Sequence, residues 1–175
     1  FEHIVKNFHY GKIGEQAYYM RGMCHYWMGH DEQALSICGN FIKNYPDSHF
    51  VPEVLFWIAQ YNYNHGNYEI AQKSFTEFAE KYPENPLADD SLLWAGLAAS
   101  KHKEYVRSIE LFTKIVKEYP KSEKMAEVRF AQADTLCELA KVSEAILIFD
   151  EIINKYPDCD LISPAWIRKG DSQFI

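Results

Sequence analysis

Four stretches of the chain share one pattern: FIKNYPDS at residues 41–48, FAEKYPEN at 78–85, IVKEYPKS at 115–122 and IINKYPDC at 152–159. The Tyr-Pro pair in each stretch follows the previous pair by 37 residues. An apolar-polar helical pattern precedes each pair. It ends there because proline has no N–H to donate and biases the residue before it away from the α region. The chain is therefore a tandem repeat in which a helix ends at each tyrosine.

Each repeat contains two helical segments separated by a short break. Glycine marks the break in the first two repeats, at Gly29 and Gly66, and is absent from the breaks at residues 103–105 and 140–142. Small residues, which let two helix axes approach closely, recur at one position of each helix. They are Gly22, Ala59, Gly96, Ala133 and Gly170 on the first helix, and Ala34, Ala71, Ser108 and Ala145 on the second. Large apolar residues follow the second set four and seven places later, which is the spacing of one helical face.

Composition narrows the class of partner. The chain carries 25 acidic and 18 basic residues, a net charge of −7. Nucleic acid is disfavoured as a partner, because binding phosphates requires a basic face. Hydrophobic residues make up 47% of the chain, which indicates a packed protein. No apolar run approaches the roughly 20 residues of a membrane-spanning helix, so we expect no membrane span here.

We find no pattern that encodes an active site, a metal site or a cofactor site. Phosphate-binding glycine loops, the GxSxG nucleophile turn and the HExxH zinc motif are all absent from the sequence. The cysteines at 24, 38, 137 and 159 form no CxxC pair, and free thiols are favoured over a Cys24–Cys38 disulfide. We therefore expect that the chain is not an enzyme. An enzymatic role would need a catalytic domain elsewhere in a longer protein.

The order of small residue, hairpin break, Ala, large apolar residue and closing Pro resembles the tetratricopeptide repeat over essentially the whole chain. The resemblance implies an all-α fold, a right-handed α-α superhelix with four full helix-turn-helix repeats flanked by partial ones. It also implies that Trp166 is a buried structural residue, and it places Arg129 and Lys169 where apolar residues are usual. The single array would comprise the end of a preceding repeat at residues 1–9, full repeats at 15–46, 52–83, 86–120 and 123–157, and a further first helix at 161–175.

A period of 37 residues exceeds the usual value of about 34, so the connectors between repeats are longer. Asn85 before Pro86 looks like an N-cap that starts the next helix early. The period and the Tyr-Pro connector are similar to those of bacterial cell-envelope repeat proteins, namely the lipoprotein of the outer-membrane barrel-assembly machinery and the periplasmic coordinator of the Tol-Pal system. This resemblance implies a periplasmic or outer-membrane-associated protein, with a cytoplasmic location as the alternative.

The family resemblance also implies a binding groove lined by the first helices. The co-chaperone carboxylate clamp is absent, because its positions carry Tyr19, Met23, Trp57, Asp90 and Trp94. The aromatic positions instead predict a groove for an extended or helical peptide, and its acidic far end would favour Lys or Arg. The alternative is that these aromatic residues mostly pack between repeats. The candidate groove residues are Tyr19, Met23, Tyr26, Phe56, Trp57, Gln60, Tyr63, Trp94, Glu127 and Asp134.

These features favour a non-enzymatic scaffold that binds an unidentified protein or peptide, within a bacterial envelope assembly. The alternative from a different class is a structural spacer or oligomerisation module of a larger protein, whose groove is unused. Self-association through apolar solenoid ends would accompany that second interpretation.

Overall fold

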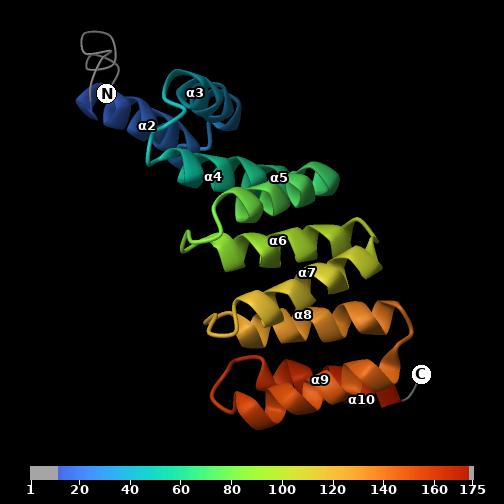
Figure 1. Cartoon of the computed structure of the whole chain (residues 1–175). Helices are drawn as coiled ribbons and strands as arrows, with labels where there is room; N and C mark the ends of the chain where they lie inside the picture. The colour runs from blue at the N-terminus through green and yellow to red at the C-terminus, as the bar shows by residue number, and fades with distance from the viewer. Residues whose placement is uncertain (1–11, 174–175) are drawn as a thin grey trace. The chain divides into compact units, whose positions relative to one another are not determined.

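The computed structural model describes residues 12–173, which form nine helices and no strand (Figure 1). The expected repeat end at residues 1–9 lies outside the described residues, as do residues 174–175. The chain divides into two compact units, Phe1–Ile58 and Ala59–Ile175, with the boundary inside helix α4. The first unit holds α2 (Lys12–Trp27), α3 (Asp31–Asn44) and the start of α4 (Val51–Asn64). The second holds the rest of α4, α5 (Tyr68–Lys81), α6 (Ala88–Lys101), α7 (Tyr105–Glu118), α8 (Met125–Glu138), α9 (Val142–Lys155) and α10 (Ile162–Gln173).

The second helix of every repeat ends at the Tyr-Pro pair, as the sequence predicts. Helices α3, α5, α7 and α9 each stop at the residue before the tyrosine. At Tyr45 φ is −134° and ψ is 60°, and the other three tyrosines lie within 10° of these values. The tyrosine N–H still donates to the carbonyl four residues earlier, which closes the last helical turn. The proline that follows then prevents the helix from continuing.

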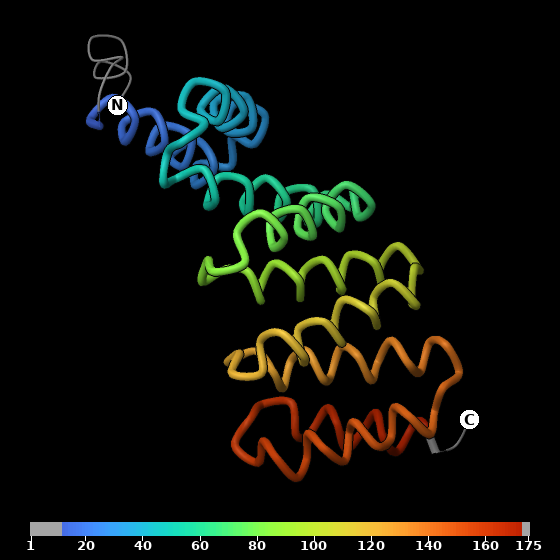
Figure 2. The backbone as a smooth tube through the Cα atoms, viewed as in Figure 1, coloured from blue at the N-terminus to red at the C-terminus, as the bar shows by residue number. Residues whose placement is uncertain are grey.

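The four hairpin breaks share one backbone geometry, with or without glycine. Gly29 and Gly66 have φ of 72° and 78°, and Lys103 and Ala140 keep the same left-handed conformation at 65° and 57°. In each hairpin the N–H of this residue bonds three residues back and the next N–H bonds five residues back. This Schellman arrangement satisfies carbonyls at the end of the first helix. In the second unit these turns lie at one end of the stacked helices and the longer connectors at the other (Figure 2).

The small residues other than Gly170 and the apolar stripe form the core, which confirms that part of the sequence analysis, whereas Gly170 is half-buried and has open space beside it. The second-helix positions Ala34, Ala71, Ser108 and Ala145 are fully buried, and so are the large side chains that follow them. In the first unit, a Cβ added at Gly22 would lie 2.8 Å from the sulfur of Cys38. In the second unit, a Cβ at Gly96 would lie 2.4 Å from the ring of Phe112. The missing side chains therefore allow paired helices to approach closely.

The connector before α6 caps the helix in a different register from the predicted one. The side-chain oxygen of Asn85 accepts a hydrogen bond from the Leu87 N–H at 2.9 Å, as an N-cap does. The Asn85 carbonyl accepts the Ala88 N–H at 2.9 Å, a tight three-residue turn. The α-helix therefore begins at Ala88, two residues after Pro86. Ser48 and Ser122 occupy the same repeat position and form equivalent turns.

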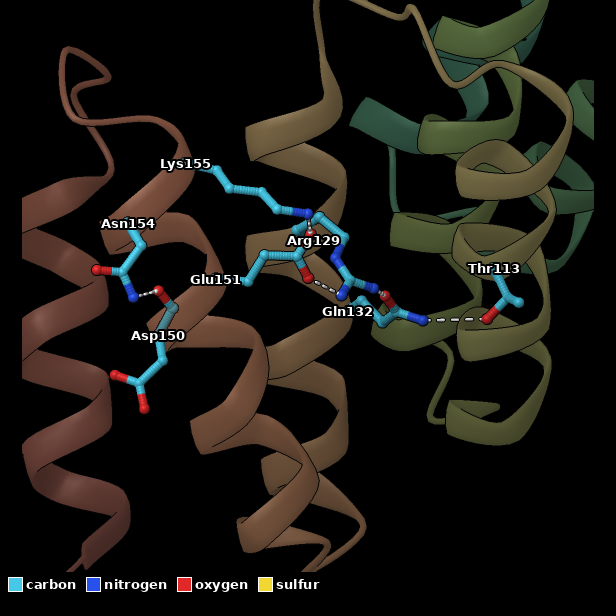
Figure 3. A network of polar contacts seen from close by, with 7 residues as sticks. All are labelled: Thr113, Arg129, Gln132, Asp150, Glu151, Asn154 and Lys155. Carbon is cyan, nitrogen blue, oxygen red and sulfur yellow. Dashed lines mark hydrogen bonds and ion pairs between the residues drawn. The ribbon is translucent and has the colours of Figure 1, made fainter.

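Arg129 replaces an apolar residue and is accommodated by a polar network that joins α7, α8 and α9 (Figure 3). Its guanidinium pairs with Glu151 of α9 and donates to the side-chain oxygen of Gln132 at 2.7 Å. Gln132 donates onward to Thr113 of α7 at 3.0 Å, and Lys155 pairs with Glu151 at 2.9 Å. The Arg129 side chain is only 18% exposed, so its positive charge is largely removed from water. The ion pair with Glu151 compensates this buried charge.

Trp166, which the resemblance places at a buried position, is 54% exposed within the described residues. In the preceding repeat the equivalent residue, Arg129, faces α9, the second helix of its own repeat. No second helix follows α10 within the described residues, so the Trp166 face of α10 has no such cover. Lys169, the other residue at an apolar position, lies over the Trp166 ring and pairs with Asp150 of α9.

Candidate binding site

In the first unit, Tyr19 is fixed by contacts on both sides of its ring. The ring stacks on Phe50 with centroids 4.3 Å apart, and the hydroxyl donates to Glu53 at 2.8 Å. Burial, and next the neighbouring Glu53 carboxylate, raise the pKa of the Tyr19 hydroxyl well above its ordinary value. Tyr19 thus joins α2 to the start of α4, and only part of its surface remains accessible.

Tyr26 and Trp57 form the second aromatic pair of the first unit. Their rings meet edge to face, with centroids 5.0 Å apart and an angle of 66° between planes. Trp57 is only 5% exposed, so it supports Tyr26 and offers little surface to a ligand. Tyr26, Met23 and Phe56 are half-buried and keep accessible surface. The sequence could place Trp57 on this helix, but burial by neighbouring helices is a tertiary property.

In the second unit, Tyr63 of α4 and Trp94 of α6 form a similar pair. Their rings also meet edge to face, with centroids 4.9 Å apart. The Tyr68 ring also meets the Tyr63 ring edge to face, and Phe75 stacks on Trp94. Burial, with a smaller contribution from Tyr68, raises the pKa of the Tyr63 hydroxyl. Both residues of the pair are half-buried, as is Gln60 one turn before Tyr63. The pair therefore presents a stiff, partly accessible aromatic surface.

The candidate acidic residues have cationic neighbours. Asp134 of α8 pairs with Arg168 of α10. Glu127 lies 3.9 Å from the ammonium of Lys124, which is also 3.9 Å from Asp90. Burial raises the pKa of Asp90, although Lys124 opposes this shift. The acidic end of the predicted groove thus carries less uncompensated negative charge than its sequence suggests.

A polar cleft of about 350 Å³ lies between α6 and α8, and only part of it was predicted. Most of its lining comes from the first helices α6 and α8, namely Leu97, Ser100, Lys101, Ala131, Asp134 and Glu138, and of these only Asp134 is among the candidate groove residues. Lys103 and Tyr105 also line it, from the hairpin and the first residue of α7. The sequence analysis missed these two residues because the repeat pattern assigns binding positions to the first helices alone.

Within the described residues, no three His, Cys, Asp or Glu side chains are grouped so that they could hold a metal ion. None of the described helices combines the length and the apolar character that crossing a membrane requires. The four cysteines are free thiols.

A family profile described as YfiO, outer membrane lipoprotein, matches residues 51–165, about two thirds of the chain. The chain belongs to the YfiO family. A tetratricopeptide repeat profile matches residues 16–48. The predicted resemblance to tetratricopeptide proteins of the envelope type is therefore confirmed, and both families are of the non-catalytic scaffold type. No curated protein sequence matches the chain.

Solved structures with similar folds include MamA from Desulfovibrio magneticus RS-1 and a tetratricopeptide repeat protein from Parabacteroides merdae. The MamA structure has a TM-score of 0.67 and 15% identity, and the match covers 83% of this chain and 77% of that one. The Parabacteroides protein has a TM-score of 0.75 and 18% identity, and the match covers 99% of this chain but only 63% of that one. At these identities the likeness shows the fold alone, and it confirms the all-α repeat architecture.

Proposed function

We propose that this chain is a non-enzymatic scaffold that binds a segment of a partner protein on the surface of its first helices. The observation that carries the proposal is that the rings of Tyr26, Tyr63 and Trp94 are ordered by their neighbours but not fully covered. Each is held by edge-to-face ring contacts yet remains partly accessible. Aromatic side chains that are already ordered lose little entropy on binding, and they dominate the energy of many protein interfaces.

The setting that we propose is a bacterial envelope assembly, in the periplasm or at the outer membrane. The support is the description of the family, outer membrane lipoprotein. The scaffold would hold its partner without chemical conversion.

Site-specific photo-crosslinking tests the binding surface. A benzoylphenylalanine placed at Gln60 or Glu127 should form a covalent adduct with one partner in living cells, because both positions lie on first helices among the candidate residues. The matched control positions are Glu77 of α5 and Lys117 of α7, which are exposed on second helices. Adducts from the first pair alone would support the proposal. Adducts from the second pair alone, or none from any position, would contradict it.

A spacer or oligomerisation module is the second candidate, and the surface of α10 favours it. Trp166 and Ile167 are adjacent, apolar, and 54% and 64% exposed. Such an apolar patch can support self-association. Sedimentation of the chain and of a Trp166→Glu variant would test this role. A concentration-dependent oligomer that the variant abolishes would favour it, whereas a monomer in both would argue against it.

A further inference from the structure

The cleft between α6 and α8 is lined by two cationic side chains that have no ionic partner among the described residues. Lys101 and Lys103 line it, and both are exposed. Within the described part of the chain, neither ammonium forms an ion pair or a hydrogen bond. The floor is polar as well, because the Thr135 hydroxyl lies 3.4 Å from that of Ser100 and 3.5 Å from that of Ser108.

The two carboxylates that line the same cleft each have one polar neighbour. Asp134 is paired with Arg168, and Glu138 accepts the Tyr105 hydroxyl at 3.4 Å. The carbonyls at the end of α6 are also occupied, since Ser100 accepts the Lys103 N–H and Ala99 accepts the Glu104 N–H. The Schellman turn therefore weakens the attraction that a helix end would otherwise have for a cation. Lys101 and Lys103 are therefore the charged side chains of the cleft that form no ion pair or hydrogen bond with another described residue.

We propose that this cleft binds an acidic side chain, Asp or Glu, of the partner segment, with Lys101 and Lys103 donating to the carboxylate. The inference rests on the proposed scaffold function, and it gives the partner a chemistry opposite to the basic ligand expected from the sequence. Leu97 and Ala131 line the same cleft and supply small apolar contacts beside the charge. An apolar residue next to the acidic one would complement them.

The backbone at Lys103 allows a clean test of this role. Two other hairpins have glycine at this position, and Lys103 adopts a left-handed conformation that disfavours any side chain. A Lys103→Gly variant should therefore fold at least as well as the wild type while it removes one proposed ligand. Ala140→Gly is the matched control, because it relieves the same backbone conformation without removing a charge.

The second variant is Lys101→Gln, with Lys117→Gln as its control. Both lysines are exposed and lie in the last turn of a helix, so the two changes should affect the helix end alike. Lys117 does not line the cleft. A loss of binding confined to Lys101→Gln would therefore come from the cleft and not from a general change in charge.

The probes are four short peptides titrated into the ¹⁵N-labelled chain at low salt. The first is acetyl-Ala-Leu-Glu-Leu-Ala-amide, and the second and third carry Gln or Lys in place of Glu. The fourth carries Gln and a free C-terminal carboxylate, which separates a chain end from a side chain. We expect the Glu peptide to shift the amide signals of Ser100, Lys103 and Thr135. The Gln peptide should bind at least about threefold more weakly, the scale of an exposed charge pair. Lys101→Gln and Lys103→Gly should each reduce that preference, and the two controls should keep it.

Equal binding of the Glu and Gln peptides would overturn the inference, as would tighter binding of the Lys peptide or of the free acid. Unchanged binding of the Glu peptide in both lysine variants would also overturn it, and so would the absence of cleft shifts with every peptide. The scaffold proposal is tested separately by the crosslinks from Gln60 and Glu127. If those crosslinks form while the cleft shows no carboxylate preference, only the inference about the cleft fails.

Discussion

Gly96 of α6 lies directly against the ring of Phe112 of α7, so that a Cβ at position 96 would come within 2.4 Å of it. Phe112 is fully buried, so a shift of its ring would disturb the packing of the surrounding core. We expect Gly96→Ala to lower the free energy of unfolding by about 1–3 kcal/mol, as overpacking of a core does. Chemical denaturation followed by circular dichroism would measure the change.

Gly170 is the matched control for that substitution, because it occupies the same repeat position in α10 and an added Cβ there would meet nothing within 4 Å. Gly170→Ala should raise stability by up to about 1 kcal/mol through helix propensity. Destabilisation of similar size by both substitutions would show that close helix packing at Gly96 is not the cause.

Replacing Ala140 by glycine should increase the stability of the protein. It holds φ of 57° in the fourth hairpin, where Gly29 and Gly66 serve in the first two. We expect Ala140→Gly to stabilise the second unit by about 1 kcal/mol, because only glycine adopts this conformation without steric cost. The converse substitution, Gly66→Ala, should destabilise by a similar amount. Thermal melts of both variants would measure these changes. A lower melting temperature for Ala140→Gly would contradict the prediction.

Arg129 and Glu151 should be coupled energetically. Burial alone would raise the pKa of Glu151, but hydrogen bonds from Arg129 and Lys155 outweigh it and lower the pKa. We expect Arg129→Ala to cost about 1–3 kcal/mol, since the pair is mostly but not fully buried. A double-mutant cycle with Glu151→Gln should give a coupling energy of about 1 kcal/mol. If the effects of the two single substitutions on the free energy of unfolding simply add, Arg129 and Glu151 are not coupled.

The lowered pKa of Glu151 also predicts how the free energy of unfolding depends on pH. Because the folded-state pKa of Glu151 lies below its unfolded value near 4.5, its stabilising contribution is present above that pH. The contribution is lost as the pH falls through the lower folded-state pKa. Urea unfolding at about pH 6 and at about pH 3, on either side of the reference pKa of a glutamate, should therefore show a smaller loss of stability in Glu151→Gln than in the wild type. An equal loss in both proteins would exclude Glu151 as a contributor.

Cys38 should be an unreactive thiol. Burial raises its pKa from 9.0 to about 11, and the side chain is 2% exposed. At pH 8 only about one thiol in a thousand would be ionised, so alkylation in the native state should be much slower than in urea. The raised pKa favours the folded state below pH 9, and this contribution declines as the pH rises toward 11. Mass spectrometry after timed iodoacetamide labelling would check the prediction, and rapid native labelling of Cys38 would contradict it.

The sequence was sufficient for the repeat, the helix ends and most of the core, because these depend on local and periodic signals. A Tyr-Pro pair ends a helix wherever it occurs, and a small residue every 37 positions marks a crossing. The conformation of Lys103 and Ala140 was not predicted, since neither residue favours a left-handed turn and the hydrogen bonds of the hairpin impose it.

The candidate site shows the limit of such signals most clearly. The sequence determined which aromatic and charged side chains lie on the first helices, because helical periodicity assigns each residue to a face. Only the tertiary structure decided that Trp57 is buried, that Trp166 is exposed and that Asp134 is paired with Arg168. Burial and charge pairing depend on which other helices are close by, and no local pattern in the chain encodes that proximity.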